Sequence, residues 1–326
     1  MGNKKSGYLM IYDCFLFNTE LELLKLRLAF MDSMVDYFVI VESKRTLSGE
    51  EKILHYKKNE LNFKKYHHKI IYLEAPVRPD LSAWEFEYFQ RDYIREGLKS
   101  CKDNDLILIS DVDEIINLKH ILSIPDLQFP VLINLPYYYY YFNLKASSSI
   151  ALNLLCNYSL IKNLNIGERN LTYKSNVKNI IKSDRYKTGW HFSYLFGENI
   201  FKYQEKIKSF SHQEFNTPYY LNEERILKCI TTGIDIFERK NFFFSFKKPE
   251  KELSEILPYI QELGLTQYLH KSPGTVRLNF KHLRFIISKK LLPLIKVKLY
   301  EQPKYKLIIK SSPFRKKIKN LITPSA

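Results

Sequence analysis

The sequence predicts an α/β fold with a mainly parallel, twisted sheet flanked by helices. Short segments that are almost wholly apolar alternate with segments whose apolar residues recur at helical spacing. Continuous apolar strands of this kind are typical of parallel sheets that helices cover on both faces. The 326 residues, 45% of them hydrophobic, are enough for one large domain or for a domain with an appendage.

The expected elements alternate regularly through the first part of the chain. The pattern predicts strands at 8–15, 37–42, 69–73, 105–110 and 131–135, and helices at 20–31 and 83–98. In the first helix, Leu21, Leu24 and Leu28 fall on one face. Further helical segments are expected at 222–233 and 250–264, whereas most of 137–240 shows no clear periodicity.

Basic charge is concentrated at the end of the chain. The net charge is +16, and the segment from Lys271 onward holds 15 Lys or Arg residues and one acidic residue. We therefore expect a folded domain at 1–268 and a basic amphipathic tail at 269–326. Such a tail favours an anionic membrane surface, and the alternative is a solvated tail that packs partly on the domain. No nucleic-acid partner is expected, because no base-stacking motif accompanies the charge.

Cysteine usage and hydropathy bear on the compartment. The four cysteines form no CxxC pair, which favours reduced, mostly buried thiols and a cytoplasmic protein. The apolar run near the start is interrupted at Asp13, and no apolar stretch of 18 residues occurs, so neither a signal peptide nor a membrane span is expected. A membrane-binding tail would make the protein peripheral on the inner face of the membrane.

Two acidic residues, Asp111 and Asp113, directly follow a predicted strand, and Glu42 ends another. Ligands of open α/β sheets bind beyond the carboxyl ends of the strands, where these side chains should lie. Two carboxylates in one cleft suit Mg²⁺ or Mn²⁺, which prefer oxygen ligands and keep positions for phosphate oxygens. In a purely structural interpretation, Asp111 caps a following helix while Asp113 and Glu114 are solvated.

Three further residues suit a site of this kind. His191 and His212 could each complete a metal site as neutral imidazoles, although a lone histidine is more often half-buried and hydrogen-bonded. Arg91, on the predicted helix before the aspartates, could bind phosphate or orient an acid. Its alternative role is a helical ion pair with Glu87.

Other enzyme signatures are lacking: the chain has no GxxxxGK[ST], GxGxxG, HExxH or GxSxG motif. One competing hypothesis is a metal-dependent phosphatase, because haloacid-dehalogenase enzymes also carry Asp-x-Asp after a strand. There the motif lies near the chain's start and continues to Thr or Val, whereas here it begins at residue 111 and continues to Ile115. A third hypothesis is a non-catalytic basic protein that binds membrane or nucleic acid.

Several separated segments occur in an order that matches a known family. They are 11–17, 20–24, 27–28, 35–43, 46–49, 90–91, 108–115, 189–194 and 210–214, and together they resemble glycosyltransferase family 17. The resemblance spans roughly residues 8 to 265. The best-known members are β-1,4-mannosyl-glycoprotein β-1,4-N-acetylglucosaminyltransferases, and bacterial and viral chains of similar length also belong.

The resemblance implies a GT-A type fold and an inverting transfer from a UDP-sugar, with UDP-N-acetylglucosamine as the expected donor. Asp111 and Asp113 would hold Mn²⁺ or Mg²⁺ against the diphosphate. His191 would add a metal or phosphate contact, and Arg91 and Glu42 would help Asp111 to place the nucleotide. The expected acceptor is a bacterial surface glycan or its lipid-linked precursor.

An inverting enzyme also needs a base that takes the proton of the acceptor hydroxyl, and this base is usually a carboxylate. Glu214 is the first candidate and Glu198 the second. The tyrosines at 137–141 and Trp190 suit stacking on sugar rings, and they suit the core equally well.

Overall fold

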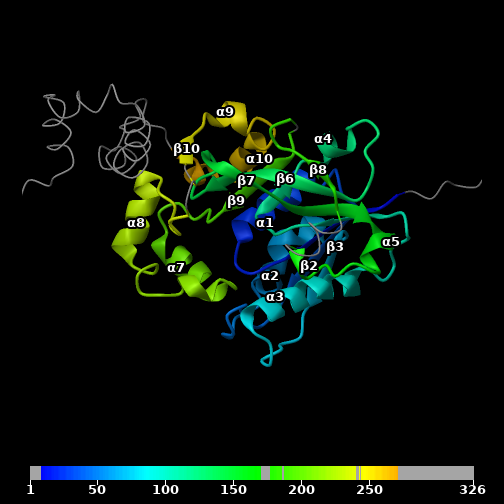
Figure 1. Ribbon diagram of the computed structural model, residues 1–326, viewed down its shortest axis with the longest axis horizontal. Helices are drawn as coiled ribbons and strands as arrows, with labels where there is room; N and C mark the ends of the chain where they lie inside the picture. Colours follow the sequence, from blue (N-terminus) through cyan, green and yellow to red (C-terminus); the bar gives the residue numbers. More distant parts are fainter. Residues whose placement is uncertain (1–8, 170–176, 186, 240–241, 243, 271–326) are drawn as a thin grey trace, which may run out of the picture. The chain divides into compact units, whose positions relative to one another are not determined.

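The computed structural model describes residues 9–169, 177–185, 187–239, 242 and 244–270 (Figure 1). The strands are β1 (Ile11–Leu16), β2 (Tyr37–Glu42), β3 (Ile70–Glu74), β4 (Leu106–Ile109), β5 (Glu114–Ile116), β6 (Val131–Tyr139), β7 (Leu144–Asn157), β8 (Asn179–Ile181), β9 (Gly189–Ser193) and β10 (Phe244–Phe246). The α-helices are α1 (Leu21–Met31), α2 (His55–Asn59), α3 (Ala83–Asp92), α4 (Leu118–Leu122), α5 (Tyr158–Ile161), α7 (Ile200–Ser209), α8 (Glu223–Thr232), α9 (Pro249–Glu252) and α10 (Leu257–Glu262). Short 3₁₀ helices are η1 (Glu60–Tyr66), η2 (Tyr93–Leu98), η4 (Gln213–Phe215) and η5 (Thr266–Tyr268).

The described strands form one sheet in the order β3-β2-β1-β4-β7-β6-β9-β5, with β10 added on β7 and β8 on β6. The first four strands are parallel, so their carboxyl ends lie at one edge. β7 runs antiparallel to β4 and β6, and β9 returns parallel to β6. This mixed but mostly parallel α/β sheet confirms the predicted fold class and is consistent with a GT-A type fold.

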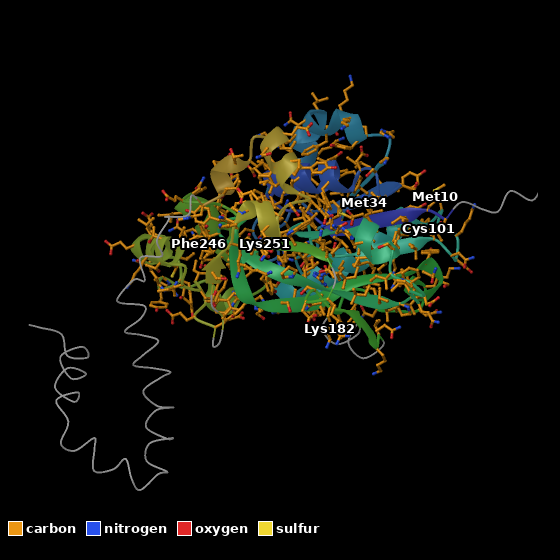
Figure 2. The ribbon with its side chains drawn as sticks, turned by 90° about the horizontal axis from the view of Figure 1, so that it is seen from above. Met10, Met34, Cys101, Lys182, Phe246 and Lys251 are labelled. Carbon is orange, nitrogen blue, oxygen red and sulfur yellow. The ribbon has the colours of Figure 1, made fainter. Side chains whose placement is uncertain are left out.

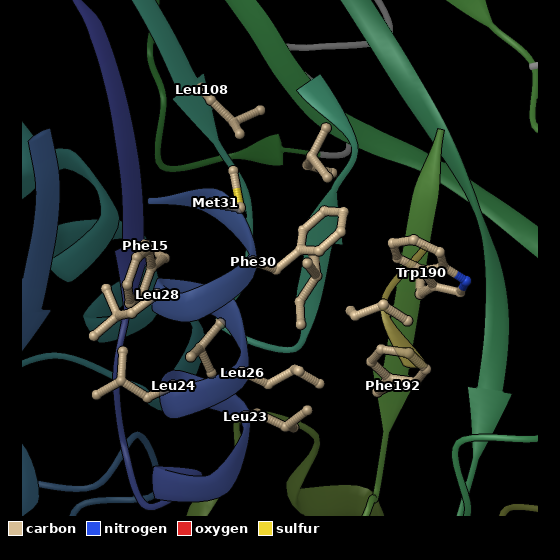
Figure 3. Close-up of a cluster of buried hydrophobic side chains, with 14 of the residues drawn as sticks. Phe15, Leu23, Leu24, Leu26, Leu28, Phe30, Met31, Leu108, Trp190 and Phe192 are labelled. Carbon is tan, nitrogen blue, oxygen red and sulfur yellow. The ribbon is translucent and has the colours of Figure 1, made fainter. Parts of the chain in front are cut away.

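Alternate residues of the central strands enter two different clusters, as the two-residue period of a strand requires. Phe15 faces the cluster that α1 covers, and its neighbour Cys14 faces the cluster that η2 and α5 cover. Figure 3 shows the leucines of α1 directed toward the strands, with Phe30 beside Trp190. Figure 2 shows side chains on both sides of the ribbon, and the two clusters bury the central strands on both faces, which explains why these strands are apolar throughout.

A third cluster surrounds the end of β6, where Tyr139, Tyr140 and Tyr141 pack against α7 and α8. These two helices lie side by side in Figure 1. Asn222 caps α8 by accepting a hydrogen bond from the Arg225 N–H (2.9 Å), and the helix ends at a left-handed glycine. The bounds of α8 agree with the helix predicted at 222–233.

Two predicted helices are interrupted in the structure. The segment 83–98 continues from α3 into η2, where Gly97 packs so closely on β2 that a Cβ would lie 2.7 Å from Val39. The segment 250–264 is divided into α9 and α10, because Pro258 lacks an N–H and is accepted only in the first turn of a helix.

The sequence pattern did not reveal several strands that follow β4 along the chain, in the part of the sheet that contains the antiparallel pairs. β7 includes an exposed serine run, 147–149, and is poor in β-branched residues. β6 extends beyond the predicted 131–135 into the tyrosine run, past a register shift at Pro136. β9 is only five residues long and begins at Gly189.

All four cysteines are free, as predicted. Among the described residues, no helix is long and apolar enough to cross a membrane. The predicted basic tail, apart from its first two residues, lies outside the described part of the chain.

We predict that Gly189→Ala destabilises the fold by about 3 kcal/mol. Gly189 has φ +126°, and a Cβ there would lie 2.1 Å from the Ile115 carbonyl oxygen. Gly264→Ala is a matched control, because Gly264 is also left-handed (φ +67°) but has nothing within 4 Å of an added Cβ. Urea unfolding should show a much larger loss for Gly189→Ala, and equal losses would contradict the clash.

A second prediction concerns Glu255, which precedes α10. Partial burial opposes its ionisation, but hydrogen bonds from Lys187, Asn117 and His120 (2.8–2.9 Å) lower the pKa of Glu255 from 4.5 to about 2. Because the folded-state pKa is the lower one, the stabilisation is complete above pH 4.5 and is lost as the pH falls toward 2. Solvent screening limits it to about 1 kcal/mol. Glu255→Gln should therefore lower stability at pH 7 and match the wild type near pH 2, as measured by urea unfolding across pH.

Candidate functional site

A cavity of about 490 Å³ lies at the carboxyl ends of β1 and β4. The Asp111–Asp113 turn contributes to its lining. We call the lining residues within 16–20, 45–52 and 84–91 the N-terminal lining. The C-terminal lining consists of Tyr139 and of lining residues within 191–194, 206–215 and 237–239. Parallel strands bring their carboxyl ends together, which explains how segments distant in sequence form one cavity.

The segment that carries the two aspartates is a tight turn between β4 and β5. The Glu114 N–H donates to the Asp111 carbonyl (2.9 Å), and the Asp111 N–H donates to the Glu114 carboxylate (2.6 Å). Asp113 is 6% exposed and Glu114 1%. The alternative of a helix cap with solvated acids is therefore wrong. Of these three acids, Asp111 is the most exposed, with 40% of its side chain accessible.

A buried arginine holds the backbone of this turn in place through hydrogen bonds. Arg27, on α1, is fully buried and forms a bidentate ion pair with Asp13 of β1 (2.8 and 2.5 Å). Its Nη1 donates to the carbonyls of Asp111 (2.8 Å) and Glu114 (2.7 Å), and its Nη2 donates to the Ser110 hydroxyl (2.5 Å). The planar guanidinium thus connects β1, α1 and the turn.

Two arginines hold the Asp111 carboxylate. Arg169 lies 2.6 Å from the Asp111 carboxylate and 2.8 Å from the Glu114 carboxylate. Arg91 lies 3.5 Å from the Asp111 carboxylate. Burial alone would raise the pKa of Asp111, but Arg169 and Arg91 outweigh it and lower that pKa. Arg91 also forms the predicted ion pair with Glu87 (2.7 Å), so its two expected roles, helical pairing and orientation of an acid, occur together.

A lysine and a histidine hold the Asp113 carboxylate. Lys206 Nζ lies 3.2 Å from Asp113 and 3.1 Å from Glu20, and His191 Nε2 lies 3.5 Å from Asp113. Burial opposes ionisation of Asp113, but Lys206 and His191 keep its pKa well below the ordinary value. Burial likewise opposes the charged form of His191, yet the neighbouring carboxylates, Asp113 foremost, raise its pKa. The site therefore contains fixed charges of both signs.

The two aspartates of the turn are the candidate ligands for a divalent cation. Asp111 and Asp113 offer carboxylate oxygens to one cavity, and His191 directs Nε2 toward Asp113 (3.5 Å) and Nδ1 toward Glu114 (3.6 Å). No group of three or more His, Cys, Asp or Glu side chains in the described part of the chain is arranged to hold a metal by itself. Mg²⁺ usually takes one or two carboxylates together with substrate phosphates, and two aspartates meet that requirement.

Glu42 was expected to place a nucleotide, but it does not line the cavity. It is fully buried and accepts hydrogen bonds from Lys52 Nζ (3.1 Å), the His55 N–H (2.5 Å), the Tyr56 N–H (3.2 Å) and the Tyr72 hydroxyl (3.1 Å). Since Lys52 belongs to the N-terminal lining, Glu42 can act on the cavity only through the segment that it anchors.

The structure separates the two predicted bases. Both side chains are exposed, but Glu214 lines the cavity and accepts a hydrogen bond from His212 Nδ1 (2.7 Å), whereas Glu198 lies outside the lining. Trp190 packs in the core against Phe30, with the ring centroids 5.4 Å apart. Within the tyrosine run, Tyr139 alone lines the cavity.

Sequence inspection missed three basic residues of the site: Arg27, Arg169 and Lys206. Arg27 had a detectable signal, because it stands between leucines on a helix that is apolar on nearly every side. Arg169 and Lys206 lie in the region without clear periodicity, and nothing local distinguishes them from solvated basic residues. Their roles follow only from the fold.

A family model described as "Glycosyltransferase family 17" matches residues 3–283 of the chain. This agrees with the resemblance and extends beyond the span estimated from the motifs. A search of curated proteins finds no match to the chain.

The buried pair yields a testable prediction. Arg27→Lys keeps a positive charge but cannot supply the fork of donors, and it should cost about 3–5 kcal/mol because Asp13 is left without its bidentate partner. Arg78→Lys is the matched control, since Arg78 forms a bidentate pair with Asp80 on the surface, with exposed fractions of 43% and 57%. Unfolding in urea should separate the two variants, and equal stability would refute the role of Arg27.

Proposed function

Because the chain belongs to glycosyltransferase family 17, it transfers sugars, and we propose that it moves N-acetylglucosamine from a UDP-sugar to a hydroxyl of a glycan acceptor with inversion. The observation that carries this proposal is the Asp111–Asp113 turn, which Arg27 fixes at the cavity. Membership of the family also favours glycosyl transfer over the phosphatase and the non-catalytic binding protein.

We expect the diphosphate of the donor to lie against this turn. Arg91 and Lys206 both line the cavity beside the aspartates, and charged N–H groups bind phosphate oxygens well. The nucleoside would lie along the N-terminal lining, at the ends of the parallel strands. Glu42 supports the N-terminal lining indirectly, because it accepts a hydrogen bond from Lys52, which belongs to that lining.

The charge of the cavity supports a metal-assisted reaction. Among the described residues, its lining includes five Lys or Arg and five Asp or Glu side chains, so the formal charge of this part of the lining is zero when the histidines are neutral. A diphosphate would enter without a net positive charge to meet it, and a divalent cation bound with the donor restores the balance. Asp111 and Asp113 would hold Mn²⁺ or Mg²⁺, with His191 as a further contact. When bound, the cation neutralises charge on the departing diphosphate.

Inversion requires a proton acceptor on the side of the sugar opposite the leaving group. We place it around Glu214, which lines the cavity, in preference to Glu198, which does not. Tyr139 and Phe237 belong to the same C-terminal lining and offer apolar surface to a sugar ring.

For the acceptor, we propose a bacterial surface glycan or its lipid-linked precursor. A lipid-linked acceptor is consistent with the basic tail, since the tail would bind an anionic membrane from the cytoplasmic side and bring the enzyme to that acceptor. This part of the proposal rests on the sequence, because residues 271–326 lie outside the described structure.

The test is donor binding and slow hydrolysis. The protein would be titrated with UDP-, GDP- and CMP-sugars, with Mn²⁺, with Mg²⁺ and with chelator, while released nucleotide and phosphate are measured. We expect one UDP-sugar to bind and to release UDP only with metal. Asp113→Asn should lower UDP release by at least about 100-fold, because it removes a carboxylate proposed to hold the divalent cation against the diphosphate.

Asp103→Asn is the control for this experiment, since Asp103 pairs with Lys162 on the surface and does not line the cavity. This variant should retain full UDP release. Failure of every nucleotide sugar to bind would refute the donor assignment. Phosphate release from simple phosphoesters, abolished by Asp113→Asn, would favour the phosphatase instead.

A further inference from the structure

His212 and Glu214 form a hydrogen-bonded pair at the cavity. Both belong to the C-terminal lining, and His212 Nδ1 lies 2.7 Å from Glu214 Oε1. Because a carboxylate only accepts, this bond places a proton on Nδ1 and leaves the lone pair of neutral imidazole on Nε2. Within the described residues, Nε2 has no hydrogen-bond partner.

Aromatic side chains on several sides orient the imidazole ring. Trp84, from the N-terminal lining, meets it edge to face, with centroids 4.6 Å apart and planes at 86°. Phe210 and Phe215 lie 5.5 and 6.0 Å away. These rings limit the orientations of the imidazole on one side, while 48% of the His212 side chain stays accessible.

Polar contacts tie the segment that carries His212 to the aspartate turn. The hydroxyl of the preceding residue, Ser211, donates to the Glu87 carboxylate. Glu87 pairs with Arg91 (2.7 Å), which reaches Asp111 at 3.5 Å. His212 is therefore positioned relative to the place proposed for the diphosphate, although the two lie about one hundred residues apart in sequence.

The other acidic side chains of the lining are already engaged by cations. Glu20 pairs with Lys206, Glu87 with Arg91, Asp111 with Arg169 and Asp113 with Lys206. Each of these four carboxylates therefore already contacts a basic side chain.

Resting on the proposed function, we infer that His212 is the general base of the transfer and that Glu214 is the residue that positions it. The acceptor hydroxyl gives its proton to His212 Nε2 while its oxygen forms a bond to the anomeric carbon. The bond from that carbon to the β-phosphate oxygen breaks, and its electron pair leaves with UDP.

Glu214 itself is the weaker base of the two. Partial burial acts to raise its pKa, but the hydrogen bond from His212 outweighs it and lowers the pKa of Glu214 below the ordinary value of 4.5. Histidine is the side chain that most often serves as a general base. The carboxylate serves better as the partner that fixes the tautomer and stabilises the imidazolium once it forms.

The experiment measures UDP release from UDP-N-acetylglucosamine with water as the acceptor. His212→Ala should lower the rate by at least about 100-fold without weakening binding of the donor, and added imidazole should restore at least about tenfold of the loss. Glu214→Gln should lower the rate by at least about tenfold. Rescue by free imidazole distinguishes a base from a structural histidine.

A second measurement needs no turnover. In ¹⁵N-histidine-labelled protein, long-range ¹H–¹⁵N correlations should show His212 as the Nδ1–H tautomer in the wild type and as a mixture of tautomers in Glu214→Gln. An Nε2–H tautomer in the wild type would overturn the inference, since that nitrogen could not accept a proton.

His120→Gln is the matched control, because His120 also pairs with a glutamate, Glu255 (2.9 Å), but does not line the cavity. It should leave UDP release unchanged. Normal donor binding with undiminished release in His212→Ala would refute this inference alone. Absence of donor binding in the wild type would refute the proposed function itself.

Discussion

The buried ion pair of Arg27 and Asp13 is the constraint on which the site depends. Taking both charges out of water costs several kcal/mol, and this cost is offset only because each donor of the guanidinium finds an acceptor. Some of those acceptors are carbonyl groups of the aspartate turn itself. The turn therefore cannot shift without uncovering a buried charge, and the two aspartates remain fixed relative to β1 and α1. A site that handles a charged leaving group benefits from such rigidity, because no reorganisation is needed when charge develops.

The parallel half of the fold could be predicted from the sequence because its central strands, β1, β2 and β4, are buried on both faces. The bounds predicted for 37–42 agree with β2 residue for residue, and those for β1 and β4 differ only at their ends. The antiparallel half could not be predicted with the same rule. β7 combines a run of three exposed serines with a run of five buried residues, and β9 begins at a glycine. Their strand conformation comes from pairing with distant segments, which local periodicity does not record.

The candidate site divides in the same way. The aspartates were found because they are adjacent in sequence and end a strand, whereas the residues that hold them are remote: Arg169 lies 58 residues from Asp111, and Lys206 lies 93 residues from Asp113. Glu42 shows the opposite error. Like Asp111, Glu42 lies at the carboxyl end of a strand. However, the following chain folds back over Glu42, and four hydrogen-bond donors cover its carboxylate. Position at a strand end indicates that a residue is near the site, and burial decides whether it reaches the cavity.

The division of the cavity between two linings has an evolutionary consequence. The N-terminal lining and the aspartate turn are attached to the parallel sheet and to Arg27, so substitutions there disturb the fold as well as the site. Much of the C-terminal lining comes from α7 and from the loops that follow it, outside the central strands. Selection can therefore alter the C-terminal lining at positions other than Lys206, His212 and Glu214 while the rigid half keeps its geometry. One scaffold of this kind can give rise to a lineage of proteins that share their chemistry and diverge in the molecules they modify.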